Sequence, residues 1–77
     1  MFKTSKISEV IGYDVVRVWK QEKMFHAKRT RMGDALTPID VEVLIIKKLR
    51  ACGLRCIIHS STEKGRTVRV SFDVKKI

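Results

Sequence analysis

The sequence predicts a small α+β domain, in which an antiparallel sheet of about four strands, arranged as two hairpins, packs on one main helix over residues 38–52. Three observations lead to this prediction: a capped apolar segment in the middle of the chain, a strict apolar–polar alternation near its C-terminus, and strand-forming residues in its first half. With 77 residues the chain has room for one domain, which we expect to span residues 1–77. A domain of this size has a thin core.

The first third of the chain is rich in strand-forming residues but also fits a helical period. The preferred interpretation has a short helix, a strand, a turn and a second strand, near residues 6–11, 13–20, 21–23 and 24–31. β-Branched and aromatic residues between Tyr13 and Trp19 favour the strand. The alternative is one long helix, because apolar residues from Ile7 onward also recur at helical spacing. Gly12 interrupts that period and favours the hairpin.

The main helix is predicted from its two ends. Thr37 provides an N-cap hydroxyl, Pro38 is suited to the first helical position, and Asp40 places a carboxylate near the positive end of the helix dipole. Gly53 is the expected C-terminal stop. The apolar stripe expected to face the core consists of Ile39, Val43, Ile46 and Leu49, widened by Leu44, Ile45 and Cys52.

The second hairpin is predicted from period-two patterns. Residues 54–60 read as a strand, with Leu54, Cys56 and Ile58 on one face, and residues 60–66 read as a polar loop. The clearest alternation follows between residues 67 and 75. Its inward positions are Val68, Val70, Phe72 and Val74, and its outward positions are Thr67, Arg69, Ser71, Asp73 and Lys75. This alternation is typical of a strand with one buried face.

The charge of the chain indicates an anionic partner. Seventeen Lys and Arg against eight Asp and Glu give a net charge of +9, and the pI is about 10.1. The first residues do not resemble a signal peptide and no apolar run is long enough to span a membrane, so we expect a cytoplasmic protein with no membrane partner. Two cysteines are too few for a disulfide framework, so we expect free thiols.

The positive charge is concentrated in two parts of the chain. Residues 17–31 carry +5 and residues 47–55 carry +4, whereas residues 32–46 carry −3. The predicted binding residues are Lys20, Lys23, Lys28, Arg29 and Arg31 in the first hairpin, Lys47, Lys48, Arg50 and Arg55 near the end of the main helix, and Arg66 and Arg69 in the last hairpin. Arg29 and Arg31 are expected to share one strand face and to bind successive phosphates, with a hydroxyl from Thr30.

These residues favour a non-enzymatic nucleic-acid-binding protein, with RNA preferred to DNA because no helix-turn-helix or zinc-finger pattern is present. Binding is expected to be mainly to the phosphate backbone. Trp19, Tyr13 or Phe25 would add a stacking surface where exposed, although we expect Trp19, the only tryptophan, to lie in the core. The thin core and exposed hairpin edges favour a homodimer.

Two other functions are compatible with this composition. One is an inhibitor or accessory protein, such as viruses and mobile elements encode, that docks its basic surface on an acidic or RNA-bound protein. The other is a small ribonuclease using His26 or His59, although neither histidine has a nearby carboxylate pattern in the sequence. We expect no enzyme activity and no cofactor. Cys52, Cys56 and the histidines lack the usual zinc spacing, so we expect core thiols and no metal.

Overall fold

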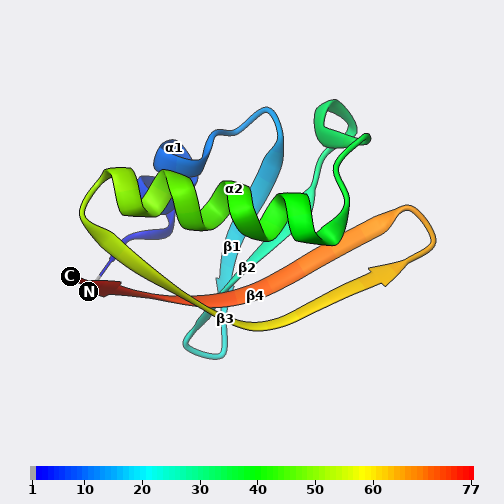
Figure 1. The fold of residues 1–77 in the computed structure, drawn as a ribbon. Helices are drawn as coiled ribbons and strands as arrows, with labels where there is room; N and C mark the ends of the chain where they lie inside the picture. The colour runs from blue at the N-terminus through cyan, green and yellow to red at the C-terminus, as the bar shows by residue number, and fades with distance from the viewer. Residues whose placement is uncertain (1) are drawn as a thin grey trace.

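The computed structural model describes residues 2–77 and shows a four-stranded antiparallel sheet with two α-helices on one side (Figure 1). The helices are α1 (Thr4–Ile11) and α2 (Pro38–Ala51), with a short 3-10 helix, η1 (Arg31–Gly33), before α2. The strands are β1 (Val16–Gln21), β2 (Met24–Arg29), β3 (Leu54–Lys64) and β4 (Thr67–Lys76). The predicted α+β class, with two hairpins and a main helix on one face of the sheet, is confirmed.

The two hairpins join into one sheet through β2 and β4. The strand order is β1-β2-β4-β3, so β1 and β3 form the edges. Phe25 of β2 lies opposite Phe72 of β4, and their stacked rings have centroids 5.7 Å apart. Pairing of β3 with β4 is irregular between Ile58 and Ser60, where an extra residue is inserted. This bulge changes which residues of β3 face each side of the sheet.

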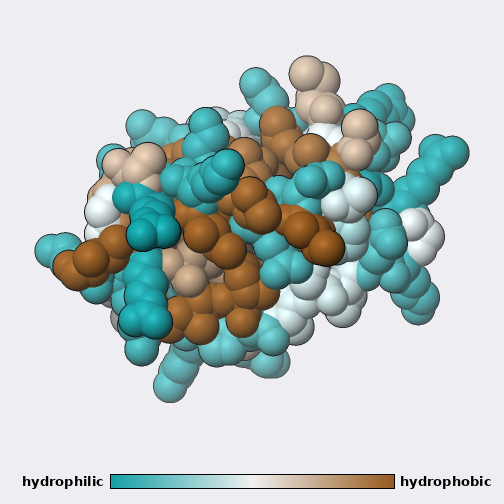
Figure 2. All heavy atoms as spheres, viewed as in Figure 1, coloured by the Kyte–Doolittle hydropathy of each residue, from teal (hydrophilic) through white to brown (hydrophobic). Residues whose placement is uncertain are grey.

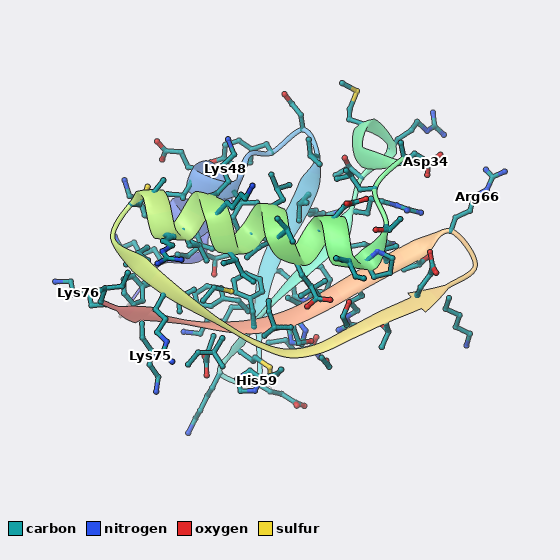
Figure 3. The ribbon with its side chains drawn as sticks, in the orientation of Figure 1. Asp34, Lys48, His59, Arg66, Lys75 and Lys76 are labelled. Atoms are coloured by element: carbon teal, nitrogen blue, oxygen red, sulfur yellow. The ribbon has the colours of Figure 1, made fainter. Side chains whose placement is uncertain are left out.

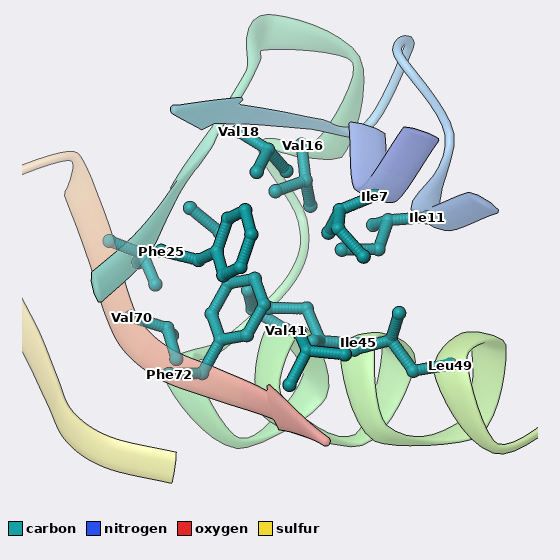
Figure 4. Close-up of a cluster of buried hydrophobic side chains, with 13 residues drawn as sticks. Ile7, Ile11, Val16, Val18, Phe25, Val41, Ile45, Leu49, Val70 and Phe72 are labelled. Atoms are coloured by element: carbon teal, nitrogen blue, oxygen red, sulfur yellow. The ribbon is translucent and has the colours of Figure 1, made fainter. Parts of the chain in front are cut away.

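The core lies between the helices and the sheet (Figure 4). The inward positions predicted for the last strand are confirmed: Val68, Val70 and Phe72 are fully buried and Val74 is almost so. The remaining core side chains come from both helices and the first hairpin, and they are Ile7, Ile11, Val16, Val18, Phe25, Ala27, Val41, Ile45 and Leu49. Burial of these side chains is the main force that holds the two layers together.

The start of α2 agrees with the prediction. The side chain of Thr37 accepts a hydrogen bond from the Asp40 backbone N–H, and the Asp40 carboxylate accepts one from the Thr37 backbone N–H. This reciprocal capping box satisfies donors that the first helical turn would otherwise leave unpaired. Hydrogen bonds from Thr37 to the carboxylate also lower the pKa of Asp40, because they stabilise its charged form.

The predicted core stripe of α2 is partly wrong. The fully buried residues of the helix are Val41, Ile45 and Leu49, whereas Ile39 is 70% exposed and Val43 is 42% exposed. Residues 43–46 are all apolar, so two neighbouring stripes of the helix fit the helical period. The contact with the sheet decides which stripe is buried, and the sequence pattern does not contain that information. The other stripe faces outward.

Several predicted boundaries are corrected. Among the helices, α1 begins at residue 4 and not near residue 6, and α2 ends at residue 51 and not at residue 52. Among the strands, β1 covers residues 16–21 and not 13–20, β2 ends at residue 29 and not at residue 31, and β3 runs to residue 64 and not to residue 60. The expected polar loop 60–66 is mostly strand, because Lys64 still pairs with Thr67 across a two-residue turn. In that turn Gly65 has a positive φ of 61°.

A long first helix is excluded by the β1–β2 pairing. Neither helix within residues 2–77 has the length and apolarity required to cross a membrane.

Candidate functional site

The face of the sheet opposite the helices carries charged and aromatic side chains. In β1, Val16 and Val18 point into the core, so Arg17 and Trp19 point to the other face, as period-two alternation requires. In β2, Phe25 and Ala27 are buried, so His26 and Lys28 face outward. In β4, the buried valines leave Arg69 and Ser71 on this open face.

Three cationic residues lie in one row across this face. Arg17 of β1 is paired with Lys28 of β2, and Lys28 is paired with Arg69 of β4. Neighbouring strands are about 4.8 Å apart, so each cation lies beside the next. None of the three has an ion-pair partner among residues 2–77. Like charges directly opposite one another destabilise a sheet, so folding alone does not account for this row.

An aromatic surface lies next to the row of cations. The rings of Trp19 and His26 are stacked, with centroids 5.5 Å apart and planes inclined by 20°. The guanidinium carbon of Arg69 lies 5.1 Å from the centre of the Trp19 ring. These distances are typical of aromatic stacking and of cation–π contacts. We call Arg17, Trp19, His26, Lys28 and Arg69 the open-face cluster.

The orientation of His26 is fixed by its neighbours. Its Nδ1 lies 2.9 Å from the hydroxyl oxygen of Ser71, and its Nε2 lies 3.3 Å from the backbone oxygen of Gln21. Both ring nitrogens therefore have partners, and the ring is held beside Trp19. A shallow hollow next to this pair is lined by Arg17, Trp19, Lys28, Thr67 and Arg69. The hollow is open to solvent and combines cations with an apolar ring.

The prediction that Trp19 lies in the core is wrong, since Trp19 is half-buried on the open face. Arg17 was not among the predicted binding residues. The signal that identifies both residues is the alternation of Val16 and Val18, which assigns their neighbours to the opposite face. Of the other aromatic residues considered, Phe25 is in the core and Tyr13 is 63% exposed in the loop before β1.

Arg29 has an internal structural role. Its side chain is 8% exposed and lies 3.7 Å from the carboxylate of Asp34. It donates hydrogen bonds to the backbone oxygen of Leu36 and, at 2.6 Å, to that of Arg66. The side chain thus ties β2 to the segment before α2 and to the β3–β4 turn. Figure 3 shows Asp34 and Arg66 at the same end of the molecule.

Arg29 and Arg31 do not share a strand face, contrary to the prediction. Strand β2 ends at Arg29, and Arg31 begins η1. Arg31 is exposed. The hydroxyl of Thr30, which was expected to add a phosphate donor, instead donates to the backbone oxygen of Asp14. The two arginines therefore do not form the pair of adjacent phosphate-binding forks that the sequence predicted.

The other predicted binding residues are distributed over the molecule. Lys28 and Arg69 are adjacent on the open face. Lys20 lies over the ring of Phe25, and Lys23 is in the β1–β2 turn. Lys48 is on the helical layer, and Arg66 is at the tip of the β3–β4 hairpin (Figure 3). Those remaining are exposed on α2 or on β3, and they are Lys47, Arg50 and Arg55.

The two histidines lie on different strands, His26 on β2 and His59 on β3, and have different partners. Nε2 of His59 lies 3.2 Å from a carboxylate oxygen of Asp73, a partner that the sequence pattern did not reveal. Within residues 2–77, no group of three or more His, Cys, Asp or Glu side chains is placed to hold a metal ion. Cys52 and Cys56 are free thiols. Cys52 is exposed, contrary to prediction, while burial and then the charge of Glu42 raise the pKa of Cys56 to about 11.

Comparison of this chain with protein-family models, with curated proteins and with solved structures finds no match. The open-face cluster is therefore interpreted from its geometry and chemistry alone.

Proposed function

We propose that this protein binds single-stranded nucleic acid, RNA in preference to DNA, across the open face of its sheet. The observation that carries the proposal is the row of Arg17, Lys28 and Arg69 beside the stacked rings of Trp19 and His26. In this proposal the cations contact phosphates and Trp19 stacks on a base. The protein acts as a binding module and performs no reaction.

The row of cations supports contact with a phosphate backbone. Three uncompensated charges on adjacent strands repel one another, and a bound polyanion would remove that repulsion. Arginine also suits phosphate because its planar guanidinium donates two parallel hydrogen bonds. The net charge of +9 adds long-range attraction for the same class of partner.

The aromatic residues support single strands over duplexes. A base stacks on a protein ring only when it is not already stacked inside a helix, and single-stranded RNA is usually recognised through such unstacked bases. The guanidinium of Arg69 lies over the Trp19 ring, so in this proposal it moves to a phosphate and a base takes its place on the ring. Within residues 2–77, no α-helix lies on this face to enter a major groove.

The two alternative functions have weaker support. An acidic protein partner would also neutralise the cations, but it gives no role to the stacked Trp19 and His26 pair. A ribonuclease needs a general acid and a general base free to move protons. Both ring nitrogens of His26 already have partners, which leaves His59 with Asp73 as a single candidate.

Fluorescence anisotropy with labelled single-stranded RNA, single-stranded DNA and their duplexes, at two salt concentrations, tests the proposal. We expect the tightest binding to single-stranded RNA. Replacing Arg17, Lys28 and Arg69 by Ala should reduce the slope of log affinity against log salt by about 2, since each phosphate contact contributes about 0.7. Trp19→Ala should weaken binding roughly tenfold, the effect of losing one stacked base. As Trp19 is the only tryptophan, its own fluorescence reports the contact without a label.

A matched control removes the same number of charges from the helical side of the molecule, through Lys6→Ala, Arg31→Ala and Lys48→Ala. This variant should bind with nearly the wild-type salt slope. Equal losses in the two triple variants would mean that only net charge matters and would reject the open-face site. Absence of binding to all four nucleic acids at low salt would reject the function and favour an acidic protein partner.

A further inference from the structure

The outward face of α2 carries apolar side chains that the fold leaves uncovered. Ile39 and Val43 are 70% and 42% exposed, and Ile46 is half-buried. Their spacings of four and three residues place them in one stripe of the helix. Figure 2 shows hydrophobic atoms along α2 and the adjoining part of the sheet. A contiguous apolar patch on a protein this small indicates an interaction surface.

A hollow lies at the opposite end of the same surface. It is lined by Ile46, Arg50, Leu54, Arg55, Cys56 and Ile77, and its volume is about 360 Å³. The apolar residues of this lining come from α2, from the edge strand β3 and from the C-terminal residue. The hollow has room for a branched apolar side chain. The most exposed apolar residue of α2, Ile39, lies at the other end of the helix.

Charges along α2 are separated by sign. Asp40 and Glu42 lie in its first half, whereas Lys47, Lys48 and Arg50 lie in its second half. When two such helices pack antiparallel, the acidic half of each lies beside the basic half of the other. A parallel arrangement would instead place like charges together. The surface is thus electrostatically complementary to an inverted copy of itself.

We propose that two copies of this chain associate through α2 and β3, with their α2 helices antiparallel around a two-fold axis near Val43. This arrangement would place Ile39 of each copy in the hollow beside Ile46 of the other. The α2 residues that line the hollow, Ile46 and Arg50, are centred about nine residues from Ile39, or about 13 Å along the helix. Val43 lies close to the midpoint of this distance. One two-fold operation makes both contacts at once, as a symmetric dimer interface requires.

The proposed dimer does not depend on the proposed nucleic-acid binding. The open-face cluster belongs to β1, β2 and β4, whereas the association surface belongs to α2 and the edge strand β3. The outer side of β3 has no neighbouring strand within residues 2–77, and the second copy would cover it. An acidic peptide would neutralise the charges of Arg50 and Arg55 at the hollow, but it would leave Ile39 uncovered. The observations therefore favour a second copy.

Sedimentation equilibrium of the full chain tests the association. We expect a mass twice the 8.9 kDa of one chain at high protein concentration. Ile39→Lys should halve the mass, because it places a third cation beside Arg50 and Arg55 in the hollow of the other copy. Met32→Lys is the matched control: Met32 is 78% exposed and lies in η1, outside α2 and β3, so this variant should remain dimeric. A monomeric wild type, or a dimer that Ile39→Lys does not disrupt, would overturn the proposal.

Crosslinking tests the position of the axis and does not depend on the loss of a contact. Val43→Cys in a Cys52→Ser background should form a disulfide between two chains under mild oxidation, because residues at a two-fold axis meet their own copies. Cys56 is half-buried and should react little. Lys48→Cys in the same background should not crosslink, since Lys48 lies on another side of the helix. Equal crosslinking through positions 43 and 48 would contradict the antiparallel packing, whatever the dimer mass.

Discussion

The two faces of the sheet differ in what their side chains contact, although the same strands supply both. Val70 and Phe72 of β4 are fully buried against the helices, whereas Arg69 between Val68 and Val70 is exposed beside Trp19. The covered face stabilises the fold, and the open face has a row of cations that folding does not favour. Neighbouring residues of one strand can therefore be changed to affect stability and binding separately.

The largest expected effect comes from the covered face. Phe72→Ala removes a fully buried ring that stacks on Phe25, and such changes lower the free energy of unfolding by about 3–5 kcal/mol. For a domain of this size that is a large part of the total stability, about 4–12 kcal/mol. Urea denaturation measures the loss. Met32→Ala, at an exposed apolar residue, should leave the midpoint nearly unchanged.

RNA binding by the open face should not change in the milder core variant Val70→Ala. If the two faces are independent, the folded fraction of this variant should bind single-stranded RNA as the wild type does. A large change in the affinity of the folded molecules would show that the covered and open faces are coupled through β4.

Arg29 gives an intermediate effect that separates structural from binding cations. Arg29→Met keeps the length of the side chain but leaves the backbone oxygens of Leu36 and Arg66 without their donor. We expect the free energy of unfolding to fall by about 1–3 kcal/mol, the range for unpaired polar groups. The salt slope of RNA binding should stay the same. A reduced slope with unchanged stability would instead assign Arg29 to the phosphate contacts.

Patterns within single elements were sufficient to predict much of this fold. The alternation from Val68 to Val74 identified the inward face of β4, and the residues around Thr37 located the start of α2. Both signals are local, because capping and period-two burial involve residues close together in the chain. These are the parts where the predicted and observed residues agree most closely.

The open-face cluster was only partly predictable because it depends on which strands are neighbours. Lys28 and Arg69 were proposed from charge, but their adjacency requires β2 to pair with β4, more than forty residues later in the sequence. Trp19 was assigned to the core from its residue type, while the valines around it decide its orientation. The outward placement of Ile39 likewise follows from how α2 meets the sheet.

The smallest expected change in stability is an increase, and it tests directly whether the open face differs from the covered face. Lys28 lies between Arg17 and Arg69 in the row of cations. Lys28→Thr removes the middle charge and introduces a residue that favours strands, so stability should rise by about 0.2–1 kcal/mol. Added salt screens the repulsion, so it should stabilise the wild type more than this variant. RNA binding should weaken at the same time. Lys20→Thr is the control, because it makes the same exchange at a strand residue that is paired with Phe25 and not with another cation, so it should raise stability less. Urea denaturation at two salt concentrations measures the difference.

A gain in stability with a loss of binding would mean that the row of cations is maintained for a bound anion at the expense of the fold. A loss of stability would mean that Lys28 supports the sheet, and the row would then be no evidence for a binding face.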